Sequence, residues 1–376
     1  MKNNAGKNAD NLLRTEEKVP YSMITAIYIH ILIGWSFIFL VSIITKPENN
    51  SYLGLIPAMI LILPTFWMAA NLARIFPDLT LSAVLVKVFG KFWGRVFGVV
   101  FFLIIIMVSN LSFREAHLMV FSYFFKRTPI FLIPLFFIAG SLYMGLKGIR
   151  SIGRLASFML IPLLLTIFGL ELFGLVNINL LNLQPVLQAP PEKWLLNGLD
   201  LAFAVLPGAS IALYMPFIRE PKNVAKVGLY SFAVIFPLFF LSLLGVIGVF
   251  GPDVVIKITW PVVEFFHLID YPYLLLEQAG LFFLIAWYAS LFVAITQVFF
   301  IIGHNLSVIF PTVKRNWFIV ALNISGFFSA LIPINTIELR KITLPLQKTI
   351  IFYFLALLTC TWLIARWRFK NKKSLI

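Results

Sequence analysis

The chain has 376 residues, of which 61% are hydrophobic and 12% are charged, and its mean hydropathy is +0.96. A soluble domain of this length could not bury so much apolar surface, so the composition excludes an ordinary globular protein. It predicts an all-α polytopic membrane protein in contact with a lipid bilayer, because helices satisfy their own backbone hydrogen bonds there. The formal net charge of +15 therefore has to be placed on a membrane topology.

Ten apolar stretches are each long enough to cross the hydrocarbon core, which takes roughly 17–25 residues. They form an expected ten-helix domain over residues 21–366, with a polar cytoplasmic tail at 1–20 and a basic cytoplasmic tail at 367–376. The expected transmembrane helices are 21–44, 52–75, 95–124, 129–146, 155–176, 198–218, 227–250, 274–302, 316–333 and 347–366.

The basic residues are distributed unevenly over this topology. With a cytoplasmic N-terminus, 21 of the 30 lie in inner segments and eight in outer ones, and Arg114 lies within a span. Lysine and arginine are retained on the cytoplasmic side, so both termini are expected there. The scatter of these residues over short loops argues against nucleic-acid binding. Arg340, Lys341 and Lys348 would lie outside and go against the rule.

Ten spans divide into two halves of five, about 21–176 and 198–366, which an odd number of crossings places in opposite orientation. Transporters built from such inverted repeats bind substrate near the midplane, where corresponding helices are interrupted. Helix breakers stand near the centres of the first and sixth spans. Proline removes an amide donor and glycine lets a ligand approach the backbone, so we predict two breaks and a ligand site between them. Its expected residues are Ile33, Gly34, Trp35, Ser36, Pro207, Gly208, Ala209 and Ser210.

A plainer interpretation of the same residues stays open. Pro207 would then only kink a helix, and Gly34 would only let two helices pack closely. His30, one turn before Gly34, is interpreted as a packing histidine. In the eighth span Trp287, Tyr288 and Ser290 are candidates for a pocket wall, although ordinary helix or lipid contacts would also explain these aromatic residues.

Ionisable side chains inside a span are expensive and mark functional positions. Arg114 and Glu115 are adjacent in the third span, so they point to different helix faces and one of them needs a partner elsewhere. Both are candidate charge partners, and we expect Glu115 to serve a ligand or a permeating cation. The alternative for Arg114 is that its long stem carries the charge toward the interface.

Motifs for catalysis are missing from the sequence. There is no GxSxG, HExxH or Walker loop, Cys360 is the only cysteine, and the four histidines are widely spaced. We therefore expect no enzyme, no cofactor and no metal site.

Four segments together suggest a family. They are IFPDLTLSAVLVKVFGKFWGRVFG (75–98), FRE with KRTP (113–115 and 126–129), PGASIALYMPFIREPKNVAK (207–226) and WPVVEFFHLIDYPYLLLEQAGLFFLIAWYASLF (260–292). With these segments the chain resembles the endospore germination permease family, the B-type subunit of spore nutrient-germinant receptors, within the amino acid–polyamine–organocation superfamily.

The resemblance implies a LeuT-like fold that binds a small nutrient germinant, with an amino acid as the expected class, in a midplane pocket between helices 1 and 6. It implies the spore inner membrane or cell membrane as location, and A-type and C-type receptor subunits as partners. Two departures concern specificity: Trp35 follows a single glycine in the first span, and Ala209 stands where the family often has Glu. An ion-coupled secondary amino acid transporter is the alternative function. The sequence does not specify which germinant binds, whether ligand, ions or water are transported, which ion would be coupled, or the receptor stoichiometry.

Overall fold

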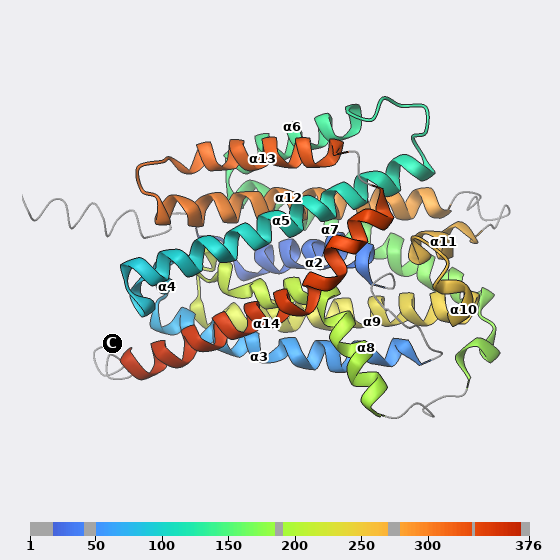
Figure 1. Cartoon of the computed structure of the whole chain (residues 1–376), viewed down its shortest axis with the longest axis horizontal. Coiled ribbons are helices and arrows are strands. Elements are labelled where there is room, and N and C mark those ends of the chain that lie inside the picture. The colour runs from blue at the N-terminus through green and yellow to red at the C-terminus, as the bar shows by residue number, and fades with distance from the viewer. Residues whose placement is uncertain (1–17, 41–49, 185–190, 270–278, 333–334, 370–376) are drawn as a thin grey trace, which may run out of the picture.

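The computed structural model describes residues 18–40, 50–184, 191–269, 279–332 and 335–369 (Figure 1). Most of the two predicted tails, 1–20 and 367–376, therefore lies outside the described residues. The described chain is helical, and its only β pairing is an isolated bridge between Val19 and Ile218. The all-α class predicted from composition is confirmed.

The helices follow one another with short connections. The α-helices are α2 (Tyr21–Phe39), α3 (Leu55–Ile75), α4 (Leu81–Phe89), α5 (Lys91–Tyr123), α6 (Leu132–Lys147), α7 (Ile149–Gly174), α8 (Pro191–Ala204), α9 (Val224–Phe250), α10 (Pro252–Val255), α11 (Pro261–His267), α12 (Ala279–Ile309), α13 (Arg315–Leu331) and α14 (Thr336–Phe369). The 3₁₀-helices are η1 (Ser51–Gly54), η2 (Leu175–Asn177), η3 (Leu180–Leu183), η4 (Leu206–Leu213), η5 (Met215–Phe217) and η6 (Pro221–Asn223).

Seven helical segments of the described chain are long and apolar enough to cross a membrane, and α8 with η4 makes an eighth if the bent pair is one span. The helices α6 and α13, of 16 and 17 residues, are shorter than these segments and are not among them. The multi-pass class is confirmed, whereas the count of ten crossings stays a prediction.

The helices pack in two groups that mix the halves of the chain. In the first group α2 and α3 contact α9 and the α8–η4 segment, and in the second α5 and α6 contact α12 and α13 (Figure 1). The first two helices of one half thus pair with the first two of the other, and the third and fourth pair likewise. This is the arrangement that a LeuT-like inverted repeat requires, so the predicted fold class is confirmed.

The predicted break in the sixth span is present. Helix α8 ends at Ala204, and η4 continues at an angle of 47° to it, with Pro207 in the first turn of η4. Pro207 has no amide hydrogen to continue the α-helical pattern, and the chain changes to 3₁₀ geometry at this point.

The predicted break in the first span is wrong. Helix α2 runs without interruption through Ile33–Ser36. A single glycine costs a helix only about 1 kcal/mol and leaves its hydrogen bonds in place, so nothing forces the chain open there. A Cβ at Gly34 would lie 2.8 Å from the Leu291 Cα of α12, so this glycine serves close helix packing.

Candidate functional site

A cavity of about 90 Å³ lies where α2, α5, η4, α12 and α14 meet. Its wall is mostly aliphatic and aromatic, and no charged side chain of the described residues lines it. Trp35 forms part of the wall. The wall therefore suits the apolar part of a small molecule.

The polar feature of this wall is a pair of side chains from the broken segment and α12. Tyr214 follows η4, and its hydroxyl donates a hydrogen bond to Gln297 Oε1. Gln297 is fully buried, and its Nε2 atom has no hydrogen-bond partner in the described structure. Both residues line the cavity. The wall therefore offers an occupant an unused amide donor.

Side chains of α2 bond the carbonyl groups around the break between α8 and η4. Tyr28 Oη donates to Pro207 O at 2.8 Å and also contacts Gly208 O. Ser36 Oγ donates to Ala204 O at 2.6 Å. A helix break exposes such carbonyls, and each needs a partner in a buried setting. Here α2 supplies these partners, so α2 and the broken helix are fastened together.

The predicted site residues divide by helix face. Trp35, Pro207 and Ser210 line the cavity. Ile33, Gly34, Ser36, Gly208 and Ala209 do not. On α2 the cavity-lining residues are Ile31 and Trp35, four apart on one face, so residues 33 and 34 point elsewhere. Gly208 faces α9, where an added Cβ would lie 2.7 Å from the Phe232 ring.

The three predicted wall residues of α12 lie outside this cavity. Trp287 stacks on Phe283 with ring centroids 6.4 Å apart, and Tyr288 packs against Phe137 at 5.1 Å. Ser290 Oγ lies 3.0 Å from His30 Nδ1. The residues of α12 that do line the cavity begin about two turns later, at Gln297.

His30 is a packing histidine, which confirms its interpretation from the sequence. Its Nε2 atom lies 2.9 Å from the carbonyl oxygen of Ala156 on α7. A carbonyl only accepts, so Nε2 carries the hydrogen and Nδ1 accepts from Ser290. The ring thus joins α2, α7 and α12 and has no ring nitrogen left for a ligand.

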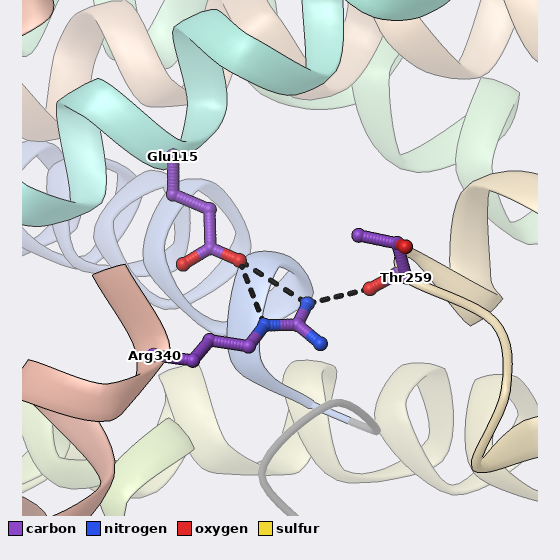
Figure 2. Close-up of polar contacts among 3 residues, drawn as sticks. All are labelled: Glu115, Thr259 and Arg340. Atoms are coloured by element: carbon purple, nitrogen blue, oxygen red, sulfur yellow. Dashed lines mark hydrogen bonds and ion pairs between the residues drawn. The ribbon is translucent and has the colours of Figure 1, made fainter. Parts of the chain in front are cut away.

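An ion pair closes the end of the bundle that the charge rule places outside. Glu115 of α5, with 1% of its side chain exposed, lies 3.2 Å from Arg340 of α14. Figure 2 shows that Arg340 also reaches the carbonyl oxygen of Thr259, at 2.5 Å, in the segment before α11. Arg114 instead donates to the Ala330 carbonyl. As expected, Arg114 and Glu115 have different partners. The ion pair with Glu115 explains why Arg340 stands at an end of the bundle where the charge rule disfavours arginine.

This outer clasp, Glu115–Arg340–Thr259, lies on the helices that form the cavity. Glu115 is six residues beyond the cavity-lining Ser109 on α5, about 9 Å along the axis. At the opposite end Lys18 pairs with Asp78 at 2.7 Å. Next to it, the Val19 amide donates to Phe217 O at 2.8 Å. The cavity is therefore bracketed by polar ties at both ends of the bundle.

Sequence reasoning missed Tyr28, Tyr214 and Gln297. One signal for Gln297 was available, because it is a lone amide within a long apolar run of the eighth span. The tyrosines gave none, since their hydroxyls matter only through partners distant in the chain.

Comparison with known proteins identifies the family of this chain. A family model described as "Spore germination protein" matches residues 18–338. The chain belongs to the spore germination protein family. The resemblance drawn from its sequence motifs is thereby confirmed, and the chain is a multi-pass, permease-type membrane protein of spore germination.

Relatives and one solved structure match over different extents. The chain is 22% identical to spore germination protein YndE of Bacillus subtilis (strain 168) over 363 residues, 95% of this chain and 98% of the relative. It is 26% identical to spore germination protein B2 of that organism over 255 residues, 65% of this chain and 67% of the relative. A solved Eremococcus coleocola manganese transporter is similar with a TM-score of 0.49 at 13% identity, covering 94% of this chain and 79% of that one.

Proposed function

We propose that this protein is the membrane subunit of a spore germinant receptor. It binds a small nutrient germinant, an amino acid, in the cavity between α2 and η4, and this binding triggers germination. The observation that carries the proposal is the unpartnered Nε2 of Gln297 in the cavity wall. A buried donor without a partner costs about 1–3 kcal/mol, and a ligand oxygen that accepts from it recovers this energy.

The carboxylate of an amino acid provides such an oxygen. Its ammonium group needs acceptors, and the cavity wall has no acidic side chain. The carbonyl of Pro207, which lines the cavity, is the suitable acceptor, but Tyr28 of α2 and Ser210 both donate to it. An amino acid therefore competes with Tyr28. Binding loosens α2 from the broken helix, and this change is the signal passed to the rest of the receptor.

The receptor setting follows from the family. We propose the spore inner membrane as its location, with both termini cytoplasmic, because 21 of the 30 basic residues then lie inside. A-type and C-type subunits are the proposed partners. Copurification of these subunits with the tagged protein from spores tests this assignment, and their absence from a functional complex would contradict it.

Equilibrium binding tests the ligand site itself. A panel of amino acids, sugars and nucleosides is titrated onto purified protein in lipid nanodiscs, and the best ligand is then titrated onto Gln297→Leu. We expect at least tenfold weaker binding, which corresponds to about 1.4 kcal/mol. Thr296→Val is the matched control, because Thr296 is a buried polar residue of the same helix that does not line the cavity. Equal affinities of wild-type and Gln297→Leu protein would refute the site.

The same purified protein distinguishes a receptor from a transporter. In proteoliposomes, a receptor subunit binds the labelled ligand up to its own stoichiometry. Accumulation of labelled ligand beyond that amount, driven by a proton or Na⁺ gradient, would instead assign the protein to the ion-coupled secondary transporters.

A further inference from the structure

A second buried site lies away from the cavity, between α7 and α9. Glu171 of α7 and Ser242 of α9 are both fully buried, and Ser242 Oγ contacts Glu171 Oε1. The other carboxyl oxygen, Oε2, has no hydrogen-bond partner in the described part of the chain. None of the ion pairs found among the described residues includes Glu171. The cavity and the ties at its two ends make no use of this carboxyl group.

The hydrogen atoms available at this site show which form of Glu171 fits. Ser242 Oγ carries one hydrogen and contacts two acceptors, Glu171 Oε1 and, at 3.1 Å, the carbonyl oxygen of Leu238. With an ionised carboxylate, one of these two contacts has no hydrogen. With a protonated Glu171, its O–H donates to Ser242 Oγ, and the serine hydroxyl donates to Leu238 O. The protonated form therefore satisfies both contacts.

Among the residues that the structure describes, none supplies a compensating charge to Glu171. Helix α9 has no ionisable side chain between Tyr230 and its end at Phe250. On α11, Glu264 accepts from Tyr123, and His267 Nδ1 lies 3.1 Å from Val263 O.

The remaining helices packed on α7 have ionisable groups with other neighbours. His30 of α2 is held by Ala156, fifteen residues before Glu171 and so about 22 Å away along α7. Tyr288 of α12 packs on Phe137, and His304 packs on Phe217. Lys147 of α6 lies over the Tyr143 ring. A charged carboxylate at Glu171 would therefore be both desolvated and unpaired.

An aromatic ring covers the site on the side of α11. Gly174 and Gly245 follow Glu171 and Ser242 by three residues each, which is one turn of their helices. The buried ring of Phe265 fits against both: an added Cβ would lie 2.3 Å from its Cζ atom at Gly174 and 2.6 Å at Gly245. The two glycines thus form a slot for Phe265. Phe265 of α11 therefore lies about one helical turn from the carboxyl group.

From this geometry we propose that Glu171 is a proton-binding site, loaded in the closed state and sealed by Phe265. When α11 leaves the slot, the O–H bond of the carboxyl group breaks, the proton passes to entering water, and the carboxylate is solvated. A divalent cation is a poorer occupant, because such ions take about six to eight oxygen ligands and only the carboxyl group and Ser242 converge here. A protein that opens and closes would thus release and bind one proton per cycle.

Infrared difference spectroscopy of the full chain in lipid tests this proposal. At neutral pH, wild-type minus Glu171→Gln spectra should contain the carbonyl band of one carboxylic acid, shifted in heavy water. Ser242→Ala should move that band to higher frequency, because the acid loses its acceptor. Glu115→Gln, the matched control, should leave the band unchanged, since Glu115 is held as a charge by Arg340. Phe265→Ala should diminish the band by letting water reach the acid.

Two results would overturn the proposal. A wild-type spectrum with the same acid bands as Glu171→Gln would mean that Glu171 is ionised. If Phe265→Ala leaves the band unchanged, Phe265 does not shield the carboxyl group of Glu171 from water. If Glu171→Gln fails to fold, Ser242→Ala still decides, because a protonated Glu171 requires its band to shift and an ionised one has no such band.

Discussion

The outer clasp allows a quantitative prediction about stability. Arg340→Gln would leave the Glu115 side chain 1% exposed without its cation, so the carboxyl group must either stay ionised and unpaired or take up a proton. Removing one partner of a buried pair costs about 3–5 kcal/mol, and we expect about 3 because the Arg340 side chain is 22% exposed and partly screened. The double variant Glu115→Gln/Arg340→Gln contains neither charge, so no unpaired charge stays buried. It should lie within about 1 kcal/mol of the wild type, since a buried ion pair contributes little net stability.

The assay is reversible unfolding in mild detergent, arranged as a double-mutant cycle. The exposed pair Lys18–Asp78 is the matched control. Its atoms are closer, at 2.7 Å, but its side chains are 30% and 40% exposed, so its coupling should be about 0–1 kcal/mol. The burial of the two pairs, rather than the distance between their atoms, then decides which pair has the larger coupling energy. A clasp whose two single variants add up within about 0.5 kcal/mol would refute this reasoning.

Three further predictions follow from particular contacts. Tyr28→Phe removes one of the two hydroxyls that donate to the Pro207 carbonyl and leaves Ser210 as the other, so about two- to tenfold less germinant should suffice in a dose–response measurement, whereas an increased requirement would contradict the competition. Gly34→Leu should prevent assembly, measured as loss of the monodisperse peak in size-exclusion chromatography, because its Cβ would meet the Leu291 backbone at 2.8 Å; a folded variant would contradict this packing. In a Cys360→Ser background, an impermeant thiol reagent should label Lys257→Cys and spare Arg219→Cys in sealed cells, and the reverse pattern would invert the topology.

The helical class and the sixth-span break could be predicted because each depends on local chemistry. Apolar runs longer than a bilayer is thick leave few alternatives to spanning helices. Pro207 lacks an amide hydrogen wherever it stands, so its effect on a helix is visible in the sequence. Gly34 differs, because glycine permits an opened helix and a tightly packed one alike. Only the neighbouring backbone of Leu291 decides between them.

The polar partners could not be predicted, because they are distant in the chain. Glu115 was noticed as an expensive charge, and Arg340 as a violation of the charge rule, yet 225 residues separate them. Gln297 shows the same limit. Its position was visible, but its role depends on Tyr214, whose hydroxyl takes the amide oxygen and leaves the nitrogen unused.

The central claim is that a germinant lies against the Gln297 amide. Solid-state NMR tests it directly, with ¹³C-carboxyl-labelled amino acid bound to protein that carries ¹⁵N in its glutamine side chains. We expect dipolar dephasing of the ligand carboxyl signal in the wild type and its loss in Gln297→Leu at saturating ligand. Dephasing that persists in Gln297→Leu, or a saturated wild type with none, would contradict the account.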